Sequence, residues 1–133
     1  MRRPALDEMP FRYGLLAFTM KKVIRAAKHL QFIRSQPCII TGQKAQACHI
    51  RILTDGGTGI KPSDFFCIGL HQDLHRQQHI LGEQSFYKKW EINPFTIAKD
   101  LVIMSDCKKV NKPEIIRLLE ERARTYGGLY QDQ

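Results

Sequence analysis

The stretch ACHIRILTDGGTGIKPSDFFCIGLHQDLHRQQH, residues 47–79, decides the fold. Its first part, Ala47–Leu53, is predicted to be a strand. A glycine-rich loop at residues 55–59 follows, and glycine at this density indicates tight turns or a surface that approaches a ligand closely. The almost wholly apolar run Phe65–Leu70 predicts a buried strand. The polar segment His71–Ile80, poor in β-branched residues, predicts a helix. The order is therefore strand, loop, strand, helix.

Helices are predicted on both sides of this central unit. Apolar residues recur at helical spacing from Lys21 to Arg34, and Pro37 ends that helix. A short strand, Cys38–Thr41, and a turn at Gly42–Gln43 lead into the central unit. Gly82 closes the helix that follows the second strand. Three more helices are predicted at residues 83–90, 94–104 and 113–126, the last one ended by Gly127 and Gly128. The fold class is α+β, mostly helical.

The size and composition fit one compact domain. The chain has 133 residues, of which 43% are hydrophobic and 26% charged, as in ordinary globular proteins. We expect a basic arm at residues 1–22 and one domain at residues 23–133, with a core at about 36–82 and C-terminal helices at 83–128. No apolar run is long enough to span a membrane and no secretory signal is recognisable, so we expect a cytoplasmic protein without a membrane partner.

Positive charge is the first indication of a partner. Lysine and arginine total 21 against 13 acids, a net charge of +8, and residues 1–34 carry eight of the basic side chains and only two acids. Such a cluster can neutralise phosphates and release counterions from a nucleic acid. A solvated basic tail without a partner explains this segment equally well, so both interpretations stay open.

Histidines, and not paired cysteines, dominate the candidate metal ligands. The four cysteines form no C-x-x-C motif, and four of the five histidines lie between positions 49 and 79. His75 and His79, four residues apart on a predicted helix, lie on one face and can bind one metal ion. Taken alone, this spacing is more typical of a solvated helix face than of a metal site. His49 could be an ordinary half-buried histidine, and Cys48 a small core residue.

The region from His29 to Asn93 resembles the HNH-type nucleases of phages and bacteria, a group that includes RecA-dependent phage nucleases and the DUF968 proteins. The resemblance covers about half the chain. It is carried by four segments in the same order and spacing: HLQFIRSQPCIITG, ACHIR, GTGIKPSDFFCIGLHQDLHRQQHILGE and FYKKWEINP. It implies a ββα-metal (HNH, or His-Me finger) core with flanking α-helices, and an endonuclease acting on DNA, with a recombinase filament as a possible further partner in recombination.

The resemblance also implies roles for individual residues. His49 matches the general base of the family, and His75 and His79 match the helix histidines that hold one divalent ion, Mg²⁺, Mn²⁺ or Zn²⁺. Cys48 stands where many members place a further metal ligand. Asp64 stands near the loop position filled by the asparagine of the HNH name and is grouped with His49 as catalytic. The candidates for contact with phosphate or DNA are Arg51, Lys61 and Arg76.

The structural zinc site of the family is degenerate in this chain. Cys38 remains, but Thr41 occupies the second position of its knuckle. In the other ligand pair His71 remains, and Leu74 occupies the second position. Two ligands do not satisfy a structural zinc ion, which requires four. We therefore expect this zinc to be absent and Leu74 to fill its place by packing.

The candidate residues suit phosphodiester hydrolysis. His49 would take a proton from water, one divalent ion would relieve charge on the phosphate and on the leaving oxygen, and Arg51 or Lys61 would add positive charge. A Cys48 thiolate would favour zinc over magnesium. Binding should be dominated by phosphate contacts, with little sequence selectivity. The alternative is a catalytically decayed member of the same fold that only binds nucleic acid.

Overall fold

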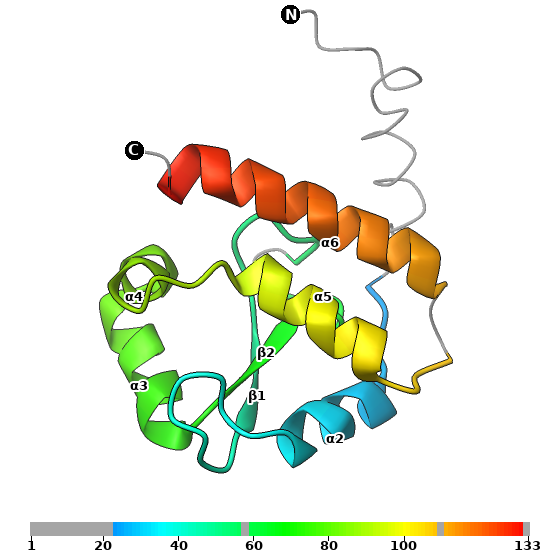
Figure 1. Cartoon of the computed structure of the whole chain (residues 1–133), viewed down its shortest axis with the longest axis horizontal. Helices are drawn as coiled ribbons and strands as arrows, with labels where there is room; N and C mark the ends of the chain where they lie inside the picture. Colours follow the sequence, from blue (N-terminus) through cyan, green and yellow to red (C-terminus); the bar gives the residue numbers. More distant parts are fainter. Residues whose placement is uncertain (1–22, 57–58, 109–110, 132–133) are drawn as a thin grey trace, which may run out of the picture.

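The computed structural model describes residues 23–56, 59–108 and 111–131, and these form a mixed α+β fold (Figure 1). The predicted basic arm at residues 1–22 lies outside this part of the chain. The described elements are α2 (Ala27–Ser35), β1 (Gln46–His49), β2 (Cys67–Leu70), α3 (Gln72–Leu81), α4 (Glu83–Lys89), α5 (Pro94–Met104), α6 (Lys112–Tyr126) and a π-helical turn (Gly127–Gln131).

The two strands form an antiparallel hairpin that is central to the fold. Gln46 pairs with Leu70 and His49 with Cys67, so the short strands are in register along their whole length. A long loop joins them, and α3 begins two residues after β2 ends. The predicted order of strand, loop, strand and helix is confirmed.

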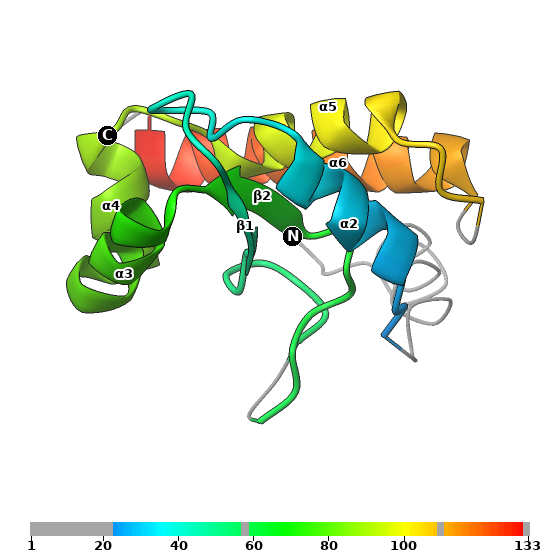
Figure 2. The same cartoon turned by 90° about the horizontal axis from the view of Figure 1, so that it is seen from below.

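Helices surround the hairpin. Helix α2 lies along one side of it and α3 along the other, while α5 packs against β2 and α6 lies beside α5 (Figures 1 and 2). The large core cluster joins buried apolar side chains of β2, α4, α5 and α6, including Ile68, Phe86, Phe95 and Leu119. A smaller cluster, with Ile33 and Cys67 at its centre, joins α2 to the hairpin.

Several helix boundaries agree with the sequence. Helix α2 ends at Ser35, before Gln36 takes an extended conformation (φ −95°, ψ 154°) as expected for the residue preceding Pro37. Asn93 caps α5, which has a proline in its first turn, by accepting a hydrogen bond from the Phe95 N–H. The α-helix α6 ends at Tyr126 with Gly127 as its C-cap, as predicted, and a π-helical turn that the sequence did not predict continues the chain over Gly127–Gln131.

Three predictions about strands need correction. Cys38–Thr41 forms a turn instead of a strand, closed by the Gly42 N–H donating to the Cys38 carbonyl at 2.8 Å. The first hairpin strand ends at His49: the Ile50 N–H still donates to the Phe66 carbonyl at 2.9 Å, but the Arg51 and Ile52 N–H groups donate to the Glu83 carboxylate, and Leu53 has a φ of +55°. The second begins at Cys67, because the Phe66 N–H closes a turn onto the Ser63 carbonyl at 3.0 Å.

No helix among the described residues is both long and apolar enough to cross a lipid bilayer.

Candidate functional site

A pocket of about 440 Å³ lies between α2 and α3, across β1. This volume falls in the range of small-molecule sites. Two elements supply the predicted histidines: β1 supplies His49, and α3 supplies His75 and His79. The other lining residues are Leu30, Arg34, Ala47, Cys48, Arg51, Lys61, Gln78, Gly82 and Glu83. The fold therefore gathers around one cavity the three imidazoles that the sequence singled out.

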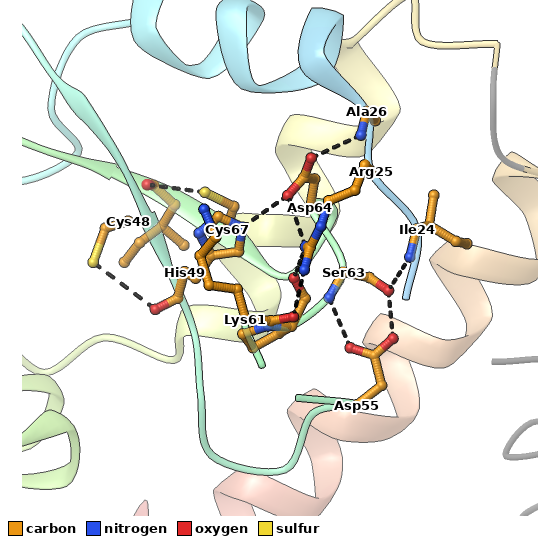
Figure 3. A network of polar contacts seen from close by, with 12 residues as sticks. Ile24, Arg25, Ala26, Cys48, His49, Asp55, Lys61, Ser63, Asp64 and Cys67 are labelled. Carbon is orange, nitrogen blue, oxygen red and sulfur yellow. Dashed lines mark hydrogen bonds and ion pairs between the residues drawn. The ribbon is translucent and has the colours of Figure 1, made fainter. Parts of the chain in front are cut away.

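His49 is held by a buried carboxylate. Its Nε2 lies 2.9 Å from Asp64 Oδ1, and the exposed fractions of the two side chains are 11% and 5% (Figure 3). The other carboxylate oxygen accepts the Ala26 N–H at 2.7 Å, and Arg25 lies 3.3 Å from Oδ1. Burial alone would raise the pKa of Asp64, but these hydrogen bonds and the Arg25 charge lower it overall. Asp64 is therefore an anion at neutral pH.

This contact fixes the tautomer of His49. An ionised carboxylate can only accept hydrogen bonds, so the proton of the neutral imidazole lies on Nε2. The lone pair is then on Nδ1, the nitrogen that a general base would use. The sequence grouped Asp64 with His49 because of its place near the loop position of the family's asparagine, and the structure shows that the two side chains are in direct contact.

A polar network holds the loop that carries Asp64. The Asp55 carboxylate accepts the Ser63 N–H at 2.8 Å and also the Ser63 hydroxyl, while Ser63 Oγ accepts the Ile24 N–H at 2.8 Å (Figure 3). Gly56 lies against this segment so closely that a Cβ there would lie 2.7 Å from Pro62 Cγ. The glycine at this position of the loop serves close packing of the backbone that leads to Asp64.

His75 and His79 face each other one helical turn apart. Their ring centroids are 5.0 Å apart and the planes differ by 29°. His75 Nδ1 lies 2.9 Å from Gln46 Oε1 on β1, which can only accept, so Nδ1 carries the proton and the lone pair is on Nε2. Burial, then the charges of His79 and His49, lower the pKa of His75. A neutral imidazole with a fixed lone pair is the form that binds cations.

Cys48 lines the same pocket but is a weaker candidate ligand. The residue is 1% exposed, and burial followed by the charge of Glu83 raises the pKa of its thiol to about 12. Metal ions bind the thiolate and not the thiol. Among the described residues, no group of three histidine, cysteine, aspartate or glutamate side chains is arranged to hold a metal ion. With only the His75 and His79 imidazoles as protein ligands, water and substrate oxygens would complete the coordination shell.

Glu83 was not singled out by the sequence, yet it fastens the segment that follows His49. Its carboxylate accepts the Arg51 N–H at 3.0 Å, the Ile52 N–H at 3.1 Å and the Tyr87 hydroxyl at 2.7 Å. These backbone N–H groups would otherwise continue the strand. The only available signal was its position in the LGE segment of the quoted resemblance.

The predicted phosphate contacts divide into two groups. Arg51 and Lys61 line the pocket. Arg76 does not line it; it is exposed and lies 3.4 Å from Asp73 on the same helix. Sequence reasoning missed Arg34, which lines the pocket, and Gln46, which contacts the pocket residue His75. Neither has a recognisable spacing signal, because each reaches the site only through the packing of α2 and α3 against the hairpin.

Cys38 and His71, the two residues that remain of the family's structural zinc site, do not line the pocket. The Thr41 N–H donates to Cys38 Sγ at 3.4 Å, and His71 caps α3 by accepting the Asp73 N–H at 3.3 Å. Burial tends to raise the pKa of Cys38, but hydrogen bonds from Thr41 and from the His71 backbone lower it overall. Leu74 is buried in the same core cluster as Cys38.

Comparison with known protein families adds a classification. Residues 13–102, more than half of the chain, match the family described as protein of unknown function, DUF968. The chain belongs to the DUF968 family. The match includes α2, the hairpin, α3 and α4, and therefore every residue that lines the pocket. No curated protein and no solved structure matches this member of the family.

Proposed function

We propose that this DUF968 protein is a metal-dependent endonuclease that hydrolyses DNA phosphodiester bonds on an HNH-type core. The observation that carries the proposal is the convergence of His49, His75 and His79 on one pocket that also holds Arg51 and Lys61. The hydrogen bonds of two of these imidazoles give them separate roles, because they direct one lone pair to Nδ1 of His49 and another to Nε2 of His75.

His49 is the proposed general base. Its Nδ1 takes a proton from a water molecule as the water oxygen forms a bond to phosphorus and the bond from phosphorus to the 3′ oxygen breaks. The leaving oxygen receives a proton from solvent. The anionic Asp64 stabilises the imidazolium that forms and keeps the ring oriented. General base catalysis of this kind contributes a factor of about 10² to 10⁴ in rate.

His75 and His79 are the proposed holders of one divalent ion. When bound, such an ion supplies charge relief on the phosphoryl oxygens and on the leaving oxygen. Gln46 keeps His75 in the tautomer suited to this role. Cys48 is left out of the proposed ligand set, because its buried thiol is neutral at physiological pH. Arg51 and Lys61 bind the phosphate and stabilise the charge that develops on it.

Nicking of supercoiled plasmid tests the proposal. Wild-type protein and His49→Ala are compared with Mg²⁺, Mn²⁺ or Zn²⁺ and with chelator. We expect metal-dependent nicking by the wild type, a loss of at least about 10²-fold in His49→Ala, and unchanged DNA binding. Arg117→Ala, an exposed arginine on α6 away from the pocket, is the matched control that keeps its activity.

A second candidate function has one observation in its favour. The described residues provide two imidazoles and no third protein ligand in a metal-binding arrangement. A DUF968 protein that binds DNA through the same pocket without cutting it would fit this donor set. Binding that is retained while no metal supports nicking by the wild type would establish this candidate and exclude the nuclease.

A further inference from the structure

Helix α2 contributes a cation to the pocket from outside the strand–strand–helix unit. Leu30 and Arg34 are four residues apart, so they share a face of α2, and both line the pocket. Helix α2 lies along the opposite side of the hairpin from α3, which carries His75 and His79 (Figures 1 and 2). Arg34 therefore approaches the cavity from the wall that faces the two histidines.

The arginine and lysine side chains that line the pocket differ from nearby arginines in whether they form ion pairs. Within residues 23–56, 59–108 and 111–131, no ion pair involves Arg34, Arg51 or Lys61. By contrast, Arg25 pairs with Asp64 behind the pocket and Arg76 pairs with Asp73 outside it. Three cations that form no ion pair with the described carboxylates, gathered around one cavity, produce a positive potential that attracts a polyanion.

The carboxylate in the described pocket wall, Glu83, forms no ion pair with these cations. Glu83 is the one carboxylate among the residues that line the pocket in the described chain. Its oxygens already accept two backbone N–H groups and the Tyr87 hydroxyl. The arginine and lysine side chains remain available for an external anion.

We propose that Arg34 binds a DNA backbone phosphate next to the one that is cut. Arg51 directly follows the His49 segment and Lys61 belongs to the loop before Asp64, so these two lie with the general base, whereas Arg34 lies on the α2 wall. A ligand that engages both groups must cross the pocket from α2 toward α3. The substrate is thus a polynucleotide strand with consecutive phosphates. This inference rests on the proposed function, which supplies the phosphate that reacts.

The test measures DNA binding separately from cleavage. Full-length protein carrying His49→Ala, without divalent metal, is titrated against a fluorescein-labelled oligonucleotide, as a single strand and as a duplex, at salt concentrations from about 50 to about 200 mM. Arg34→Ala, Arg34→Lys and the control Arg117→Ala are each added to this background. Thermal melting of each variant checks the fold, which an exposed side chain at position 34 should not disturb.

Loss of one phosphate contact has a defined signature. Arg34→Ala should weaken binding and reduce the slope of log K against log salt by about 0.7 for single strands or about 0.9 for duplex. Arg34→Lys should restore most of the slope, and Arg117→Ala should leave it unchanged. An unchanged slope in Arg34→Ala, or equal losses in both alanine variants, overturns the assignment. If the slope changes but the wild type nicks no plasmid, Arg34 is still a phosphate ligand and the nuclease proposal alone fails.

Discussion

The pocket and the Cys38 turn both belong to the region that resembles the HNH-type nucleases, but they differ in how many of the expected ligand residues they keep. In the pocket the three histidines remain, and two of them have a partner that orients the ring: Asp64 for His49, and Gln46 for His75. At the Cys38 turn, two of the four expected ligand positions hold Thr41 and Leu74, and the leucine is buried in the core. The comparison leads us to propose that apolar packing replaces the structural metal at the Cys38 turn, whereas no packing could supply the lone pair or the proton acceptor that the pocket needs for its proposed function.

The strongest way to break this comparison is to remove the partner of His49. Asp64→Asn replaces an obligatory acceptor by an amide, which can present its NH₂ group to the ring and favour the opposite tautomer. We expect the plasmid-nicking rate to lose most of the factor of about 10² to 10⁴ that a general base provides. The folded state should survive, since the amide oxygen can still accept the Ala26 N–H. Nicking at the wild-type rate would show that the tautomer of His49 has no role.

The second test probes packing at the Cys38 turn. Leu74 is 8% exposed, and Leu74→Ala should lower the free energy of unfolding by about 2 to 5 kcal/mol through lost burial and a cavity. Chelator should leave the denaturation midpoint of the wild type unchanged, because leucine occupies the place of a ligand. A midpoint that falls on chelation would mean that Cys38 and His71 still take part in a structural metal site.

A sharper test of the pocket concerns Gln46, which touches His75 but would not touch a metal ion. Gln46→Ala removes the acceptor that fixes the imidazole, and loss of such a partner typically weakens metal affinity about 10- to 100-fold. Calorimetric titration with zinc measures this change. The control is Gln72→Ala, an exposed residue at the start of α3. Equal affinities for Gln46→Ala and wild type would exclude an orienting role.

The smallest expected effect is on the pH dependence of stability, and it concerns His29, a buried histidine outside the pocket. His29 is 2% exposed and its Nε2 has no hydrogen-bond partner among the described residues. Burial lowers the pKa of His29 below its ordinary value of 6.5, Asp64 opposes this and Lys112 reinforces it. As pH falls below that value, the unfolded chain binds a proton here that the folded protein does not, so stability is lost.

Replacing this histidine should remove that part of the pH dependence. His29→Gln is compared with the wild type by chemical denaturation between about pH 8 and about pH 5. We expect the variant to lose less unfolding free energy over this interval than the wild type does. If both lose the same amount, the proton balance of His29 makes no contribution to acid stability.

How far the sequence predicts the fold depends on the range of the interactions involved. Helices α3 to α6 were predicted within one or two residues, because apolar spacing, capping residues and prolines act locally. Both strands were predicted too long. The first ends where Glu83 accepts the Arg51 and Ile52 N–H groups, a contact over 31 or 32 positions that no local pattern encodes. The second begins after a backbone turn from Ser63 to Phe66, within a run of apolar residues that favours a strand.

In the candidate site, too, local features could be predicted from the sequence and long-range contacts could not. The spacing of His75 and His79 places both on one face of α3, and the structure brings them to the pocket with His49. The partners that give these rings their tautomers, Gln46 and Asp64, lie 29 and 15 positions away from the histidines they contact. Such contacts depend on how the helix and loop pack against the hairpin, so the residue types could be predicted but not their pairing.

The central claim is that His75 and His79 hold one divalent cation beside His49. Nitrogen-15 spectra of the imidazoles during titration with zinc test it directly, because coordination displaces the resonance of the nitrogen that donates the lone pair. We predict that His75 Nε2 and one nitrogen of His79 shift together and saturate at one equivalent, with His71 unaffected. Saturable shifts at His71 instead, or no saturable shift at either helix histidine of the pocket, would contradict the account.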